Sequence, residues 1–380
     1  FWLKSEQLAA MAASAFGPDL AGTLLSSGER WGAFDPAQVE YEGDVDAVFA
    51  SRSVEVVASG FRWTEGPTWA AQLGALLFSD TIDARVYKWT SSEGVSVMLE
   101  HSGGFDGANV EGHDMLFEPG SNGMALDGDD LYICQHPTHR VVKVRLSELQ
   151  PASRFCENGF AVLADSFEGR PLNSPNDVVV GVGAPGVWFT DPIYGFLRKQ
   201  AADSHLPVLP KEPAEPSNRN PADLPYLDER CSEGIGMKGV YRWRDGQLEL
   251  ATKAHERPNG LAFSPDGKLL WVANSSKDAP SWTAYSVTEE LPLEPLLTLG
   301  EDQLGPMPGP GVSDGFKVDD RGWIWSSMPA GICVIDPEPS RPRLVAKVIL
   351  KTNISNIQFG ADGDVWITGL GHLWRMKRKL

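Results

Sequence analysis

The chain has 380 residues and a formal net charge of −18, and 42% of its residues are hydrophobic. This length and hydrophobic content suffice for one large or two medium domains with a sizeable core. The acidic balance argues against the basic surface that nucleic acid or an anionic membrane would require, and no apolar run approaches the ~20 residues of a membrane span. The four cysteines include no C-x-x-C pair, so a zinc or redox motif is not indicated.

The start of the chain predicts a helix. The stretch "SEQLAAMAASA" is followed by Gly17-Pro18, a pair that stops a helix. We therefore expect residues 1–50 to form a helical or irregular extension and residues 51–380 to form the folded domain. The chain begins at Phe1, so a processed secretory leader and a cytoplasmic location are both open.

From about residue 60 onward, one pattern occurs six times. A polar turn is followed by an alternating strand, a Gly or Asp-Gly turn, and a strand centred on an aromatic residue. A third strand such as "RVYKWT" follows each copy, and several copies add a fourth such as "VSVMLE". Four antiparallel strands repeated every roughly 40–55 residues predict an all-β, six-bladed propeller. The copies begin at "TEGPTW", "GSNGMA", "SPNDVV", "RPNGLA", "VSDGFK" and "ISNIQF".

Two segments interrupt this pattern, and the last copy is incomplete. Residues 195–236 are rich in Pro and polar residues and predict an inserted loop that is long enough to be a lid. A second insertion covers residues 101–120. The last copy stops at its third strand, "HLWRMK", and residues 53–59 are expected to supply its outer strand and close the ring.

One polar residue occupies the same place in every copy. The first strand of a propeller blade lines the central channel, so these residues are expected at one depth around the axis. All six side chains carry an oxygen, and burying them without a partner is costly, whereas a hard cation such as Ca²⁺ binds six to eight oxygens. The alternative is that they cap turns, although Glu is a poor turn former. The six are Glu65, Asn122, Asn176, Asn259, Asp314 and Asn356.

The stretch "GVSDG", residues 311–315, matches the G-x-S-x-G nucleophile elbow of serine hydrolases. An elbow needs a strand before the serine and a helix after it. The preceding "LGPMPGPG" is too rich in Pro and Gly for a strand, and the following residues alternate and turn like a hairpin. We therefore predict that Asp314, rather than Ser313, is the functional residue of this stretch.

Several segments resemble the gluconolactonase branch of the senescence-marker-protein/gluconolactonase family. They are "TEGPTW", "NSPNDVVV", "VWFTDPIYG", "RPNGLAFSPDGKLLWVAN" and "VSDGFKVDDRGWIW", and the likeness runs from about Ser53 to the end. The resemblance implies a six-bladed propeller, one divalent cation in the channel, usually Ca²⁺, and lactone hydrolysis; Mg²⁺, Mn²⁺ and Zn²⁺ stay open as alternatives. On matching positions it implies the metal ligands Glu65, Asn176, Asn259 and Asp314.

The expected chemistry follows from such a cation, which polarises a lactone carbonyl while a nearby carboxylate removes a proton from water. We predict Asp314 as this catalytic base, with Glu65 as the competing choice. Asn122, Tyr194 and His136 are the candidates for substrate binding, and ordinary packing explains Tyr194 and His136 equally well.

Two further aspartates, Asp177 and Asp191, are candidates for hydrogen bonds that hold the ligand side chains, with loop stabilisation as the equal alternative. The expected partner of the protein is a small-molecule lactone such as D-glucono-1,5-lactone, with no nucleic acid or membrane partner, and a monomer is compatible with the sequence. Two other functions stay open. One is hydrolysis of other lactones or phosphoesters, as in paraoxonases and diisopropyl fluorophosphatases, and the other is a non-catalytic, calcium-stabilised binding platform.

Overall fold

A computed structural model describes residues 34–104, 116–155, 159–198, 226–227, 235–276, 280–305, 313–328 and 330–380. The helix expected before Gly17 and most of the insertion at 195–236 lie outside these residues. Within them, no helix has the length and apolar character needed to cross a bilayer.

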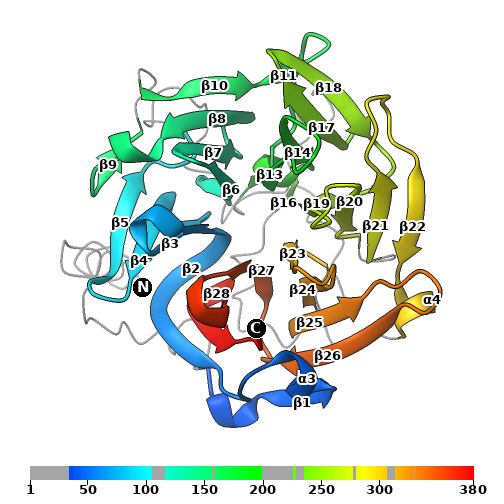
Figure 1. The fold of residues 1–380 in the computed structure, drawn as a ribbon. Helices are drawn as coiled ribbons and strands as arrows, with labels where there is room; N and C mark the ends of the chain where they lie inside the picture. The colour runs from blue at the N-terminus through cyan, green and yellow to red at the C-terminus, as the bar shows by residue number, and fades with distance from the viewer. Residues whose placement is uncertain are drawn as a thin grey trace.

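Antiparallel sheets are arranged radially around a central axis, and one edge strand of each sheet lies nearest that axis (Figure 1). The described part of the chain is therefore an all-β propeller with four-stranded blades, which confirms the predicted class. Three sheets contain only the strands of one repeat. They are β6 (Ser121–Asp127), β7 (Asp130–Gln135), β8 (Arg140–Arg145) and β10 (Ala161–Ala164); β13 (Val178–Val180), β14 (Val187–Asp191), β17 (Gly239–Arg244) and β18 (Gln247–Thr252); and β19 (Pro258–Phe263), β20 (Leu269–Asn274), β21 (Ser281–Ser286) and β22 (Pro295–Leu299).

A fourth sheet includes a strand from the expected N-terminal extension. β1 (Glu40–Gly43) pairs antiparallel with β26 on the outer edge of this sheet. The helical elements of residues 34–50 are a 3-10 turn at Pro36–Gln38 and the four-residue α3 (Val45–Val48), so the described part of the expected extension shows no long helix. Val45 and Val48 are buried against the sheet, which fixes β1 in place. The other strands are β23 (Phe316–Val318), β24 (Ile324–Met328), β25 (Gly331–Asp336) and β26 (Arg343–Ile349).

The fifth sheet has seven strands, so the described structure contains five large sheets where the sequence predicts six blades. The reason is β2 (Glu55–Ala70), whose 16 residues pair with β28 in their first half and with β3 in their second half. Strands of the last and first repeats therefore merge into one sheet. Its other members are β27 (Ile354–Phe359), β28 (Asp364–Lys377), β3 (Ala75–Asp80), β4 (Arg85–Thr90), β5 (Gly94–Glu100) and β9 (Ser153–Arg154).

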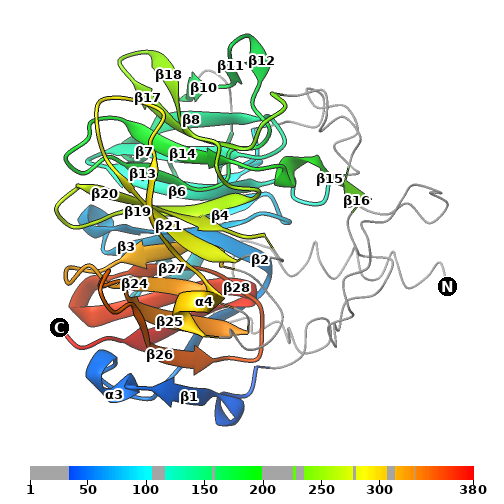
Figure 2. The same ribbon diagram turned by 90° about the vertical axis from the view of Figure 1, so that its right-hand side faces the viewer.

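The remaining elements are short. α4 (Glu301–Leu304) follows β22, and a small hairpin joins β11 (Ser166–Phe167) to β12 (Arg170–Pro171). β15 (Leu197–Arg198) pairs with β16 (Tyr226–Leu227), and this pair lies on one face of the ring in side view (Figure 2).

Apolar side chains fill the space between neighbouring sheets. Leu77 and Leu99 of one sheet pack with Leu131 and Val142 of the next, and all four are buried. Alternation along each strand directs successive side chains to the two opposite interfaces, so a strand such as β3 is apolar on both faces. This packing holds the inner strands at fixed positions around the axis.

Candidate active site

Hydrogen bonds link the six polar positions of the repeats into a closed cycle. Each bond joins the turn or the second strand of one repeat to the turn of the next, so the structure brings all six positions together around the axis. The donors and acceptors are Ser79 Oγ to Asn122 O (2.9 Å), Gly123 N to Asn176 O (2.7 Å), Thr190 Oγ1 to Asn259 O (2.8 Å), Gly260 N to Asp314 O (3.1 Å), Gly315 N to Ser355 O (2.7 Å) and Ser355 Oγ to Thr64 O (2.6 Å).

Glycine follows the polar residue at four of these positions because the neighbouring turn comes very close. A Cβ atom on Gly66 would lie 2.2 Å from the Asn122 carbonyl oxygen, and one on Gly260 would lie 2.6 Å from that of Asp314. Real Cβ atoms do not tolerate such separations, so the close approach requires glycine here. The same applies to Gly123 and Gly315.

The expected ligand side chains are in mutual contact. Asn176 Nδ2 donates to Asn259 Oδ1 at 2.7 Å, and Asn259 Nδ2 lies 3.5 Å from the Tyr194 hydroxyl. The Asn259 side chain also hydrogen-bonds Asp314, which lowers the pKa of that carboxyl, although burial raises it more. Asn356 Nδ2 lies 3.5 Å from Glu65 Oε2. Three of the four expected ligands therefore form one connected group, and Glu65 joins the ring through Asn356.

Burial differs among these groups. Glu65, Asn176 and Asn259 are at most 4% exposed, whereas Asp314 and Tyr194 keep partial exposure. Asp314 is therefore the most exposed residue among the four expected ligands. Asn122 is also buried, and its backbone carbonyl forms part of the hydrogen-bonded cycle.

Negative charge accumulates at the centre of the ring. Burial, together with the charges of Asp314 and Asp177, raises the pKa of Glu65 well above its usual range. Burial, with Glu118 and Asp177, does the same for the pKa of Asp314. Lys317 supplies a positive charge that lowers the pKa of Asp177, though less than burial raises it. Among the described residues, one lysine lies beside these four carboxyl groups, so ionisation of all four would leave an excess of negative charge.

The side chains fit a hard divalent cation. Within the ranges that the structure describes, no three His, Cys, Asp or Glu side chains cluster so as to hold a metal ion. The candidate centre therefore consists of two carboxylates and two amides, all of which offer oxygen, the ligand atom that Ca²⁺ prefers. A bound cation would also offset the charge that raises the pKa values of Glu65 and Asp314.

Glu118 and His136 extend the site toward the first insertion. His136 is fully buried, and its Nε2 lies 3.3 Å from Asn176 Oδ1. Its Nδ1 lies 3.0 Å from Glu118 Oε2, without the alignment of a hydrogen bond. His136 thus contacts an expected ligand. Sequence reasoning missed Glu118, because this residue lies outside the repeats and no register marks it.

Two aspartates that were candidates for holding ligand side chains have different roles in the structure. Asp191 accepts hydrogen bonds from the backbone amides of Asn173 and Ser174, and so holds the turn before Asn176 rather than its side chain. Asp177 accepts from its own neighbour, the Val178 amide, and also from the Leu261 amide and the Asn356 side chain, so it holds an asparagine of the ring that is not among the four expected ligands. The Ser313 hydroxyl donates to the Asn274 carbonyl at 2.9 Å and is buried, so it has a structural use.

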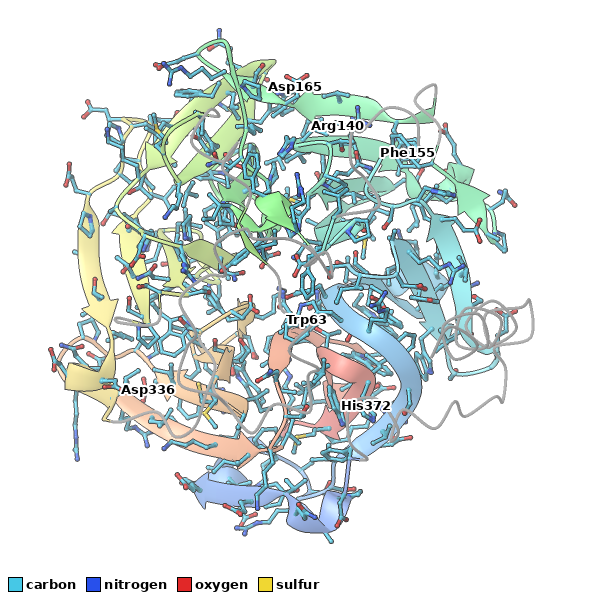
Figure 3. All side chains as sticks on the ribbon, turned by 180° about the vertical axis from the view of Figure 1, so that it is seen from behind. Trp63, Arg140, Phe155, Asp165, Asp336 and His372 are labelled. Atoms are coloured by element: carbon cyan, nitrogen blue, oxygen red, sulfur yellow. The ribbon has the colours of Figure 1, made fainter. Side chains whose placement is uncertain are left out.

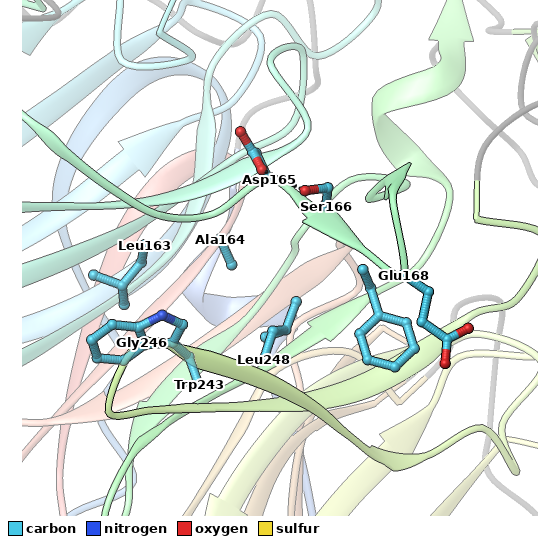
Figure 4. A pocket seen from close by; sticks show the side chains of 9 residues that line it. Leu163, Ala164, Asp165, Ser166, Glu168, Trp243, Gly246 and Leu248 are labelled. Atoms are coloured by element: carbon cyan, nitrogen blue, oxygen red, sulfur yellow. Dashed lines mark hydrogen bonds between the residues drawn. The ribbon is translucent and has the colours of Figure 1, made fainter.

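A surface pocket of about 400 Å³ lies away from this centre, beside the β11–β12 hairpin (Figure 4). Figure 3 places Asp165, which lines it, at the outer rim, whereas Trp63 lies near the axis. The pocket lining includes none of the residues predicted for the site, so the ring centre is the candidate active site. The apolar lining of the surface pocket comes mainly from Leu163, Phe167, Trp243 and Leu248.

Fold and site together define a β-propeller with an oxygen-rich centre, and comparison with known proteins agrees. The chain belongs to the SMP-30/gluconolactonase/LRE-like family, whose model matches residues 63–370, which confirms the resemblance noted in the sequence. A gluconolactonase of Zymomonas mobilis is 31% identical over 333 residues, which cover 86% of this chain and 82% of the relative.

Solved structures extend this similarity. A gluconolactonase from Xanthomonas campestris superimposes with a TM-score of 0.65 at 25% identity, covering 92% of this chain and 98% of that one. The calcium-binding protein regucalcin from Agrobacterium tumefaciens gives a TM-score of 0.55 at 11% identity, covering 86% and 94%. The second likeness concerns the fold alone.

Proposed function

We propose that this protein hydrolyses an aldonolactone, such as D-glucono-1,5-lactone, to the aldonic acid. The observation that carries the proposal is the meeting of Glu65, Asn176, Asn259 and Asp314 at the ring centre, with both carboxyl pKa values raised. Family membership and relatives described as gluconolactonases support the choice of substrate class.

The same four residues would hold one divalent cation, with Ca²⁺ preferred because every donor is an oxygen. The description of regucalcin as calcium-binding agrees with this preference, although its likeness to this chain is one of fold only. When bound, the cation polarises the lactone carbonyl and stabilises negative charge on its oxygen.

Asp314 is our choice for the general base because it is the most exposed of the four expected ligands. It takes a proton from water, whose oxygen forms the new bond to the carbonyl carbon. The ring C–O bond then breaks, and the proton passes to the departing oxygen. Tyr194 lies beside Asn259, from where its hydroxyl can donate to a substrate oxygen. Glu65 is more deeply buried and is better suited to binding the cation.

We also infer that the seven-stranded sheet comprises two blades, which gives the six-bladed ring expected of the sequence. Support comes from the closed cycle of hydrogen bonds, which passes through six turns in sequence order and returns from Ser355 to Thr64. It also comes from β2, whose two halves pair with different repeats.

The test is hydrolysis of D-glucono-1,5-lactone followed by pH-stat, above the uncatalysed rate. Wild-type protein is measured as purified, after EDTA treatment, and after Ca²⁺ is restored. We expect turnover that EDTA abolishes and Ca²⁺ recovers, and a loss of at least ~100-fold in Asp314→Asn, since the variant lacks the base and a negative ligand.

Ser313→Ala is the matched control, because Ser313 neighbours Asp314 and is equally conspicuous in the sequence. It removes a buried hydrogen bond to the Asn274 carbonyl, which affects stability, and we expect most of the turnover to remain. Turnover that survives EDTA would refute the metal-dependent mechanism. If wild-type protein with Ca²⁺ shows no turnover, sugar lactones are rejected, and lipophilic lactones and phosphoesters become the next substrates.

A further inference from the structure

Two buried aspartates cap the turns that lead into two of the expected ligands. Asp80, at the end of β3, accepts hydrogen bonds from the amides of Arg62 (2.7 Å) and Trp63 (3.2 Å). Asp191, at the end of β14, accepts from the amides of Asn173 (2.9 Å) and Ser174 (2.7 Å). In both cases, the bound amides lie two and three residues before the ligand, which is Glu65 in one turn and Asn176 in the other.

The third repeat of this arrangement uses an asparagine. Asn274, at the end of β20, accepts from the amide of Arg257 at 3.0 Å, two residues before Asn259. In all three cases the capping residue follows its ligand by the same interval of 15 residues. The capping side chains are at most 9% exposed, so water does not compete for these bonds.

These caps occur in repeats that carry an expected ligand, and they do not occur in every repeat of the propeller. In the repeat of Asn122, the residue paired at the end of the second strand is Gln135, whose Oε1 accepts from Thr138 Oγ1 and Arg140 Nε and not from the amides of the preceding turn. In the repeat of Asn356 it is Gly369, which has no side-chain acceptor. The fourth expected ligand, Asp314, is held more directly, since its own amide donates to Ser327 Oγ at 3.0 Å. A device needed only to build a blade would recur at all six positions.

We propose that Asp80, Asp191 and Asn274 are positioning residues, which fix the turns of Glu65, Asn176 and Asn259 in the geometry that binds a divalent cation. This inference rests on the proposed metal centre. Buried side-chain acceptors, two of them carboxylates, hold the backbone of these turns in place before the cation binds. The cation then does not have to order the turns, so the protein binds it more tightly. Trp63, one of the held residues, lies near the axis in Figure 3.

The experiment compares Asp191→Ala and Asp191→Asn with Asp319→Ala. Asp319 is a matched control: it is also buried, at 2% exposure, and caps the amides of Arg321 and Trp323, but in the turn at the far end of β23. Proteins are stripped with EDTA, Ca²⁺ affinity is measured by isothermal titration calorimetry, and Tm is measured on the same samples. We expect Ca²⁺ binding to weaken at least tenfold in Asp191→Ala and less in Asp191→Asn, which keeps one acceptor oxygen as Asn274 does. Asp319→Ala should lose Tm with its Ca²⁺ affinity unchanged.

The inference is overturned if Asp191→Ala binds Ca²⁺ as wild type does, or if Asp319→Ala loses affinity to the same extent. Should Asp191→Ala not fold, Asp191→Asn decides in the same way. If wild-type protein binds no Ca²⁺, the proposed metal centre fails and this inference fails with it. Binding by wild type with equal affinity in all variants rejects the positioning role alone.

Discussion

Glu65 and Asp314 show how burial at the centre of the ring changes the acidity of two carboxyl groups. Each would have an ordinary pKa on the surface, yet burial and the neighbouring carboxyl groups raise both pKa values. A group with a raised pKa holds a proton more tightly and is a stronger base once it is ionised. The same electrostatic repulsion favours a cation, so the base strength and the metal binding that we propose would have one origin.

The pKa of Asp191 leads to a prediction for stability. Burial raises it from 3.8 to about 7, in spite of hydrogen bonds from the amides of Asn173 and Ser174. The unfolded chain releases this proton near pH 4 and the folded chain keeps it until about pH 7. The free energy of unfolding therefore falls as pH rises through this window, and the loss is complete above pH 7. Its size is on the order of 4 kcal/mol, since one pKa unit is worth about 1.4 kcal/mol.

Asp191→Asn should flatten this part of the pH profile, because the amide does not titrate. Urea denaturation between pH 4 and pH 8 in EDTA measures the difference between variant and wild type, so titration of the other carboxyl groups cancels. Exposed Asp165→Asn serves as the control and should follow wild type. Parallel profiles for wild type and Asp191→Asn would contradict the prediction.

The sequence indicates some of these residues better than others. Aligning the six repeats is enough to find Glu65 and Asp314, because the function that we propose for them coincides with the repeat register. The caps also have a register, visible as "FSD", "FTD" and "VAN" at the ends of second strands, but the hydrogen bonds to the preceding turn need coordinates. Glu118 lies outside the repeats, so no position in the repeat indicates it, and only the fold brings it close to His136.

At the scale of elements, glycine follows the polar residue at four of the six inner turns, where the neighbouring turn comes too close for a Cβ atom. Gly260→Ala would place a Cβ atom 2.6 Å from the Asp314 carbonyl oxygen, which is backbone and cannot rotate away. We expect a loss of about 1–3 kcal/mol in the free energy of unfolding. Ca²⁺ affinity should fall as well, because the turn that carries Asp314 must move.

Gly300→Ala is the control for this change, since its added Cβ would meet no atom closer than 3.6 Å. Urea denaturation and Ca²⁺ titration of both variants provide the comparison. A Gly260→Ala protein with the stability and Ca²⁺ affinity of wild type would show that the close approach of these turns is not required.

Strands were predictable from alternation and turn residues, and third strands such as "RVYKWT" and "GICVID" coincide with β4 and β25. Two features of the strands could not be predicted from the sequence. β1 is short and polar, and only its pairing with β26 makes it a strand. β2 reads as two separate strands in the sequence, and its continuity, which merges two repeats, depends on partners distant in the chain.

At the scale of the whole molecule, cation binding should stabilise the ring, since all the expected ligands come from different sheets. Ca²⁺ at 100 times its dissociation constant adds about 2.7 kcal/mol to the free energy of unfolding. Scanning calorimetry with Ca²⁺ and with EDTA should therefore give a Tm higher by a few degrees in Ca²⁺. Added NaCl should reduce the difference, because it screens the net charge of −18 that attracts cations.

Asp314→Asn should show a smaller Ca²⁺-dependent shift than wild type, since it has lost one negative ligand. Equal Tm values for wild type in Ca²⁺ and in EDTA would reject a structural contribution from the cation. An equal shift in wild type and Asp314→Asn would place the stabilising cation at another site.

The pairing of β2 with β28 joins residues as far apart in the chain as Glu55 and Arg375, which are also linked by an ion pair of 2.7 Å. Every large sheet consequently has a neighbouring sheet on both sides, so the ring is closed. We expect a closed ring of this kind to tolerate one break in the backbone. If the chain is cut at an exposed turn such as Asp245-Gly246, each fragment still packs against a neighbouring sheet at both of its ends. The fold therefore lends itself to expression as two separate polypeptides that assemble into one ring.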